Sequence, residues 1–73
     1  METFLISKIE ELAFVKVNPD DALWPNVLDS ITIVELSVEI ENEYGINIPL
    51  EEIVEENFHT VRKIVDFITS KLA

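Results

Sequence analysis

The fold of this chain is decided by one stretch, LDSITIVELSVEIENEY at residues 28–44. Its apolar residues recur at the three- and four-residue spacings of one helix face: Ile33, Leu36, Ile40 and Tyr44. Residues 36–41 also alternate as a strand would, but no other segment alternates convincingly enough to pair with them. We therefore predict a helix over residues 30–44. Gly45 should end it, because glycine best adopts the left-handed cap conformation.

A carboxylate and a hydroxyl stand together where this helix begins. Either Asp29 or Ser30 can cap it, because short side-chain oxygens accept hydrogen bonds from the free N–H groups of the first turn. Those N–H groups and the helix dipole also favour an anion, so a serine here is well placed to carry a phosphate ester. Most such pairs are only caps, and the pair alone therefore assigns no chemistry.

A second apolar line runs along the same predicted helix, starting one residue after Ser30. This line and the acidic residues around it are Ile31, Val34, Val38, Glu35, Glu39 and Glu41. Apolar patches ringed by charge often mark partner-binding sites. The alternative is that the line packs against the preceding loop or the next helix, and the pattern leaves both interpretations open.

The length and composition indicate one small helical domain, residues 1–73, with a modest core. An apolar content of 48% is too high for a disordered tail. The chain has no cysteine, which excludes a disulfide framework and thiolate chemistry from the protein itself. Its apolar runs are too short for a membrane span or the core of a signal peptide.

Charge is the strongest bulk signal, with fifteen acidic residues against five basic ones and a net charge of −10. No basic residue lies between Val17 and Val61, whereas eleven acidic residues do. Such a field repels nucleic acid and anionic lipid and attracts basic protein surfaces. An acidic face that only aids solubility would look the same.

The remaining elements are read from periodicity and turn residues. We predict a first helix over 2–15, a loop over 16–29, a short helix over 50–56 and a last helix over 61–72 capped by Thr60. Within the long loop, we expect Trp24 to be partly buried, because a small domain usually needs a large aromatic for packing. Residues 57–59 are predicted to be a loop.

The usual catalytic and metal-binding sets are missing from the sequence. His59 is the only histidine, and we expect it on the surface. Acidic pairs such as Asp20-Asp21 lack the spacing of a dedicated calcium loop. We therefore expect neither a catalytic residue nor a metal site.

As a whole, the chain resembles an acyl carrier protein over essentially its full length. The resemblance rests on LDSI at 28–31, where that family has an Asp-Ser-Leu motif, on VEL at 34–36, IENEYG at 40–45, INIP at 46–49 and FHTV at 58–61. It implies an all-α, antiparallel four-helix bundle with three longer helices, a short third helix and a long first loop. The protein would be a cytoplasmic monomer.

The resemblance also implies a function centred on Ser30. A phosphopantetheinyl transferase would use Mg²⁺ to move 4′-phosphopantetheine from coenzyme A to this serine. The terminal thiol of the arm would then hold acyl groups for fatty-acid, polyketide or related biosynthesis. Asp29, Glu35 and Glu41 match positions that meet basic surfaces on acyl-loading and acyl-transferring enzymes, and Ile31, Val34 and Val38 match positions around the root of the arm.

Two departures from the family pattern point to a specialised carrier. Thr32 stands where fatty-acid carriers often have an acidic residue, and Ile31 replaces the usual leucine. Asp29 argues against the peptidyl carriers, which usually have histidine there, whereas a D-alanyl or other aminoacyl carrier keeps the Asp-Ser pair. A rival from another class is an unmodified acidic adaptor that binds a basic partner through Glu35, Glu39 and Glu41, with Ser30 as a simple cap. A weaker third interpretation is a calcium-responsive domain.

Overall fold

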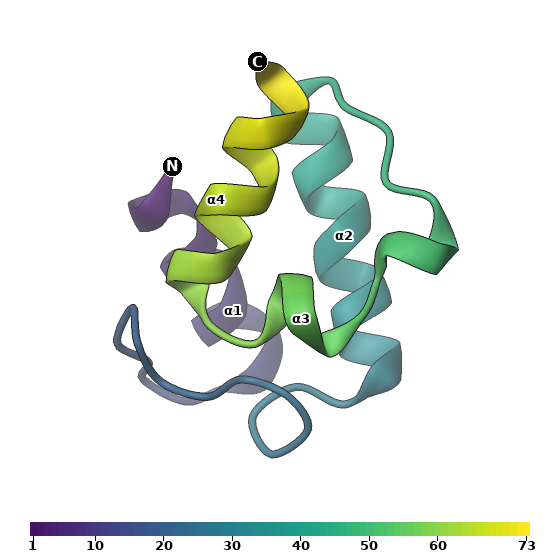
Figure 1. The fold of residues 1–73 in the computed structure, drawn as a ribbon. Coiled ribbons are helices and arrows are strands. Elements are labelled where there is room, and N and C mark those ends of the chain that lie inside the picture. The colour runs from purple at the N-terminus through teal and green to yellow at the C-terminus, as the bar shows by residue number, and fades with distance from the viewer.

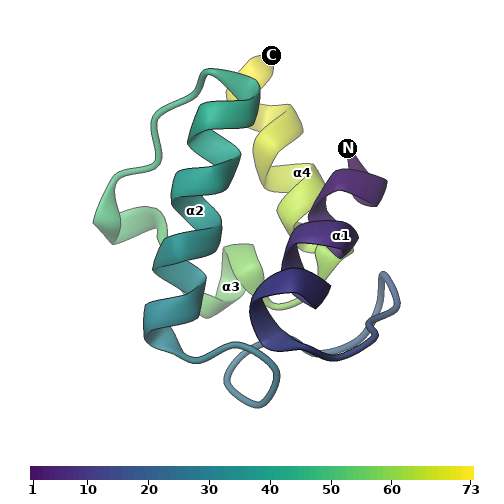
Figure 2. The ribbon, with the colours of Figure 1, turned by 180° about the vertical axis from the view of Figure 1, so that it is seen from behind.

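Four α-helices and one short 3-10 helix make up the chain, and the computed structural model describes all of residues 1–73. The elements are α1 (Glu2–Ala13), α2 (Ser30–Tyr44), η1 (Leu50–Glu52), α3 (Glu55–Phe58) and α4 (Val61–Leu72). The predicted helical bundle with three longer helices is confirmed (Figure 1). Helix α1 runs opposite to both α2 and α4 (Figures 1 and 2). Helices α2 and α4 run in the same direction because the connector after α2 returns the chain to the end where α2 began (Figure 1).

The core lies between the three long helices and is closed at one end by α3 and the first loop. Leu5 and Ile9 of α1 meet the predicted α2 stripe, and Val61, Ile64 and Ile68 of α4 complete the bundle. These apolar side chains leave water because the three- and four-residue spacing puts them on one face of each helix. The loop adds Leu23 and Leu28, both fully buried. Trp24 is partly buried, as predicted.

The C-terminal ends of α1 and α2, which we call the helix exits, have the same structure. Phe14 and Gly45 adopt left-handed backbone conformations, with φ of 60° and 64°, and their N–H groups donate to the carbonyls of Glu10 and Glu41. The carboxylates of these two glutamates then accept the N–H groups of buried residues seven positions on, at 3.1 Å from Val17 and 2.7 Å from Ile48. Each glutamate thus holds the outgoing chain against the end of its helix.

The predicted bounds of the first helix and of the short helix were wrong. Helix α1 ends at Ala13 and not at residue 15, because Phe14 turns left-handed, so the loop begins two residues earlier. The short helix predicted over 50–56 is split into η1 and α3 by Ile53 and Val54, both outside helical geometry. The predicted loop at 57–59 was also wrong in part, because Asn57 and Phe58 belong to α3 and Phe58 is fully buried.

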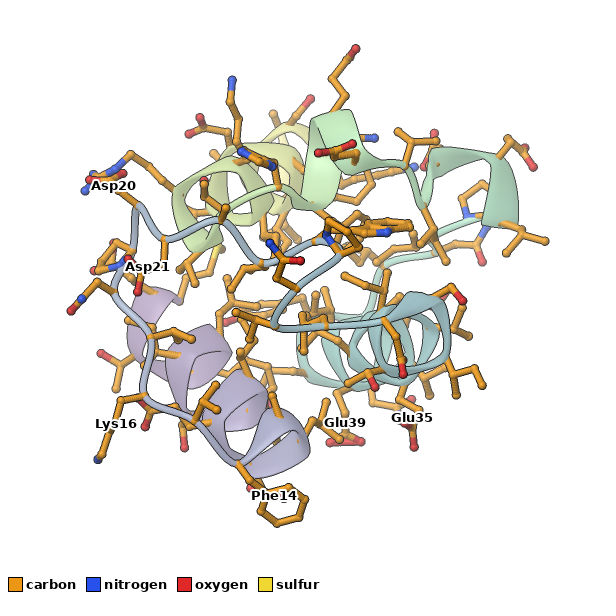
Figure 3. The ribbon with its side chains drawn as sticks, turned by 90° about the horizontal axis from the view of Figure 1, so that it is seen from below. Phe14, Lys16, Asp20, Asp21, Glu35 and Glu39 are labelled. Carbon is orange, nitrogen blue, oxygen red and sulfur yellow. The ribbon has the colours of Figure 1, made fainter.

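The first loop is fastened to the start of α4. The Leu23 N–H donates to the carbonyl of His59 at 2.7 Å, and the Arg62 N–H donates to the carbonyl of Pro19 at 3.1 Å. The Arg62 guanidinium also pairs with Asp20, which lies with Asp21 on the outer bend of the loop, at a shortest distance of 2.7 Å (Figure 3). These contacts fix the segment that leads into α2. No helix of the chain is both long enough and apolar enough to cross a lipid bilayer.

Candidate functional site

The start of α2 shows which member of the Asp-Ser pair caps the helix. Asp29 is the cap, and its Oδ1 accepts hydrogen bonds from the backbone N–H and the hydroxyl of Thr32, both at 2.8 Å. These two donors, the backbone N–H first, hold the pKa of Asp29 below its usual value. Ser30 is the first helical residue and is exposed, so its hydroxyl is free of the capping role.

The backbone on both sides of Ser30 is well anchored. Leu28, two residues before it, is fully buried, and the N–H groups of Val27 and Leu28 both donate to the carbonyl of Leu23, at 2.9 and 2.8 Å. On the helical side, the Ile33 N–H donates to the carbonyl of Asp29 at 3.0 Å, and Ile33 is fully buried. The serine hydroxyl therefore stands at a fixed place on the surface.

The second apolar line of α2 is partly open to solvent. Ile31 is 73% exposed, Val34 41% and Val38 46%. Ile31 is therefore open to solvent, whereas Val34 and Val38 are each partly covered, so the line is packed in part and accessible in part. An exposed apolar line that begins beside Ser30 is suited to contact with a partner or with a group attached to the serine.

The three acidic residues around this line have different surroundings. Glu39 pairs with Lys8 of α1 at 3.0 Å, and Glu41 is held by the Ile48 N–H. The hydrogen bond with Glu39, and then the charge of Glu11, raise the pKa of Lys8. Glu35 forms no ion pair and is exposed, so it is the member of this set that is free to meet a positive group.

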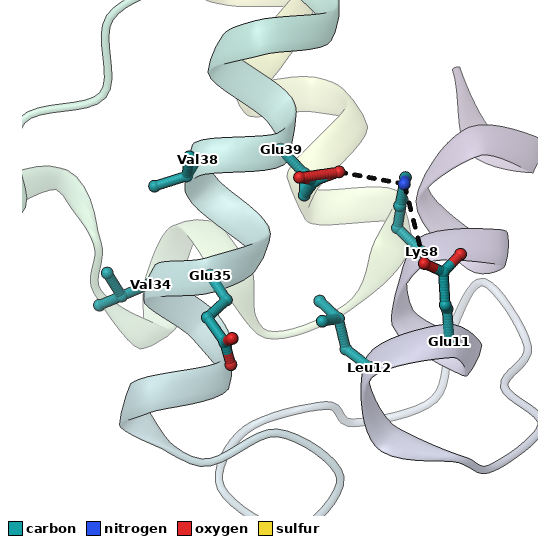
Figure 4. A pocket seen from close by; sticks show the side chains of 7 residues that line it. All are labelled: Lys8, Glu11, Leu12, Val34, Glu35, Val38 and Glu39. Carbon is teal, nitrogen blue, oxygen red and sulfur yellow. Dashed lines mark ion pairs between the residues drawn. The ribbon is translucent and has the colours of Figure 1, made fainter.

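A surface groove of about 390 Å³ lies between α1 and the part of α2 that carries Glu35 and Glu39. Glu35 and Glu39 lie on the side of α2 toward α1, which contributes Lys8, Glu11 and Leu12, while the side chains of Val34 and Val38 point away from α1 (Figure 4). Reasoning from sequence missed the α1 side of the groove. The one available signal was Lys8, the only basic residue in the first fifteen, which sits one helical turn from the apolar Leu12.

The geometry at Ser30 fits a covalently attached phosphate group. The serine lies in the first turn of a fifteen-residue helix, where the dipole favours negative charge. Because Asp29 caps the helix and Leu28 holds the chain, modification of Ser30 need not disturb the fold. The exposed surface along Val34 and Val38 leaves room for a group larger than phosphate.

Comparison with known proteins agrees with this picture. Residues 28–68 match the family described as phosphopantetheine attachment site, and Ser30 is the third residue of that segment. The D-alanyl carrier protein of Streptococcus sanguinis is 38% identical over 68 residues, which cover 89% of this chain and 86% of that protein. The D-alanyl carrier protein of Bacillus velezensis is 41% identical over 56 residues, covering 75% and 72% of the two chains.

Proposed function

The chain belongs to the family of phosphopantetheine-bearing carrier proteins, and from that premise we propose that Ser30 bears the arm and that its cargo is an amino acid of the D-alanine type. The 4′-phosphopantetheine that this family bears covalently supplies a terminal thiol, which holds a carboxylic acid as a thioester. Such an arm gives thiol chemistry to a chain without cysteine.

The observation that carries the proposal for Ser30 is its exposed hydroxyl immediately after the Asp29 cap. In the rival adaptor hypothesis Ser30 is only a helix cap, whereas in the structure it is Asp29 that accepts the Thr32 N–H. The buried Leu28 and Ile33 on either side favour a fixed presentation of the hydroxyl to a modifying enzyme.

Two observations favour an aminoacyl cargo over the fatty-acid or polyketide cargo that we expected first. Relatives that align over most of this chain, such as those of two Streptococcus species, are named D-alanyl carrier proteins. In addition, Leu28, Leu36 and Phe58 belong to the one hydrophobic core and are fully buried, so a long acyl chain entering the bundle would displace core side chains such as these. A D-alanyl group is small and needs no room inside. Thr32 and Ile31 also fit a specialised carrier.

In this proposal the protein presents cargo and leaves catalysis to its partners. These are a phosphopantetheinyl transferase, an enzyme that loads the amino acid and an enzyme that removes it. The exposed Ile31, Val34 and Val38 beside Asp29 and Glu35 give each partner an apolar contact within a negative field. Such a surface favours fast and reversible docking to basic sites.

The test has two stages, both read by intact mass. The protein and its Ser30→Ala variant are first incubated with coenzyme A, Mg²⁺ and a promiscuous transferase, and only the wild type should gain one phosphopantetheine. The loaded protein is then offered D-alanine with an ATP-dependent ligase that activates it, and separately a fatty acid with an acyl-activating enzyme. Loading of D-alanine supports the proposal, whereas loading of the fatty acid alone would show that the protein carries fatty-acyl groups instead.

A further inference from the structure

We propose that the loaded arm crosses the exposed side of α2 over Val34 and Val38, and that the ammonium group of its amino-acid cargo pairs with Glu35 at the groove between α1 and α2. This inference rests on the proposed function, because only an aminoacyl cargo carries that positive charge. It assigns to the groove a role toward the cargo of this chain itself, separate from any role in docking a partner.

The path from Ser30 to Glu35 is continuous on the surface of α2. Ser30, Val34 and Val38 are spaced by four residues and therefore form one row of neighbours along the helix. Val34 and Val38 are both half-exposed, so an arm lying on this row covers apolar surface that water now contacts. Glu35 lies beside Val34 in the next row and faces the groove (Figure 4).

The arm is long enough for this contact. An extended chain of the roughly thirteen bonds between the phosphorus and the sulfur spans roughly 15 Å, at about 3.5 Å for every three bonds. Glu35 lies five residues after Ser30, which is about 7.5 Å along the helix axis. The arm therefore reaches Glu35 with slack, which lets its middle rest on Val34 and Val38.

The charges of the groove single out Glu35 among its three carboxylates. Lys8 pairs with Glu39 at 3.0 Å and lies 4.0 Å from Glu11, so both carboxylates already have a positively charged partner. Glu35 forms no ion pair. An α-ammonium, with a pKa of about 8, is positive at neutral pH and is complementary to this free carboxylate. Leu12 on the facing wall shields the pair partly from water.

The experiment compares two cargoes that differ only in the amino group. A promiscuous transferase attaches the D-alanyl or the propionyl form of phosphopantetheine, each with an amide in place of the thioester for stability, and intact mass verifies loading. Methyl and amide NMR spectra then report on Leu12, Val34, Glu35 and Val38. We expect larger shift changes along the groove for the D-alanyl form. The equilibrium constant for the cargo resting at the groove should be about 1.4- to 5-fold higher for D-alanyl than for propionyl, which is the usual contribution of an exposed ion pair. This advantage should fall with added salt.

Two matched variants assign the effect. In the Glu35→Gln variant, the shift changes caused by the D-alanyl form should be no larger than those caused by the propionyl form. Glu43→Gln removes the same charge from an exposed position two turns further along α2, and should leave the difference between the cargoes intact. Equal spectra for the two cargoes on the loaded wild type, or a difference that survives in Glu35→Gln, would overturn the pairing while leaving the carrier function standing. Failure of the transferase to load the folded protein would overturn both proposals.

Discussion

Asp29 and Ser30 are neighbours in sequence, yet the start of α2 gives them separate tasks. The sequence predicted where the pair would stand, because a loop with turn residues gives way there to a helical stripe. It left open which residue caps, since both side chains are short and oxygen-bearing. The hydroxyl of Thr32 decides the matter by giving Asp29 a second donor at 2.8 Å. That contact appears only once the helix is built.

Two single substitutions should separate these tasks. Asp29→Ala should lower the free energy of unfolding, because the Thr32 N–H loses its acceptor, whereas Ser30→Ala should change it by less than about 0.5 kcal/mol, as for an ordinary surface position. Urea unfolding of both variants at neutral pH measures this contrast. If Ser30→Ala proved the more damaging change, the assignment of the cap to Asp29 would be wrong.

The same cap predicts a pH dependence. The folded-state pKa of Asp29 lies below its unfolded value of 3.8, so its contribution is fully present above that value and is lost as the pH falls through the folded pKa. The difference in stability between wild type and Asp29→Asn should therefore shrink on acidification below pH 3.8. A difference that stayed constant into strong acid would contradict this account.

At the scale of elements, helix bounds were predictable where a capping residue stands in the sequence. Helices α2 and α4 have the predicted bounds because Asp29 and Gly45 enclose the first and Thr60 starts the second. The end of α1 was missed because a phenylalanine in left-handed conformation leaves no sequence signal. The split between η1 and α3 was missed because Ile53 and Val54 leave helical geometry although neither is a proline or a glycine that would signal a break.

The two similar helix exits yield a paired prediction. Phe14→Gly should raise the free energy of unfolding by about 1 kcal/mol, because glycine adopts positive φ without steric cost and the phenyl ring is 90% exposed. Gly45→Ala should lower it by about the same amount through backbone strain alone, since an added Cβ meets nothing within 4 Å. Thermal unfolding of both variants is the measurement. Changes of the same sign would contradict this account of the exits.

Phe58 tests how much the shortest helix contributes to the bundle. Its ring is fully buried and lies 5.6 Å from that of Phe67, centroid to centroid. Phe58→Ala should cost about 3–5 kcal/mol, the usual range for a core phenylalanine, while Asn57→Ala on the same helix should cost far less. Denaturant titration gives both values. A cost below about 1 kcal/mol for Phe58→Ala would mean that α3 is not part of the cooperative core.

At the scale of the whole molecule, charge opposes folding. A net charge of −10 is confined to a body with a radius of gyration of 10.8 Å, about one Debye length at 0.1 M salt. The midpoint of thermal unfolding should therefore rise as NaCl is increased toward 1 M, where the Debye length falls to about 3 Å. Replacing Glu51 and Glu56, which form no ion pair, by glutamine should flatten that rise. A flat midpoint in the wild type would show that the acidic residues do not repel one another appreciably.

The fastening of the first loop to α4 also has a consequence for the order of events during synthesis. The loop that leads to Ser30 gains its partners His59 and Arg62 only after residues 59–62 have been made, with the Asp20–Arg62 link spanning 42 positions. Contacts of such high sequence separation form late. A ribosome-bound or truncated chain lacking α4 would have Ser30 without the contacts that hold the preceding loop, so we expect a modifying enzyme that recognises surface shape to act only after α4 has been made.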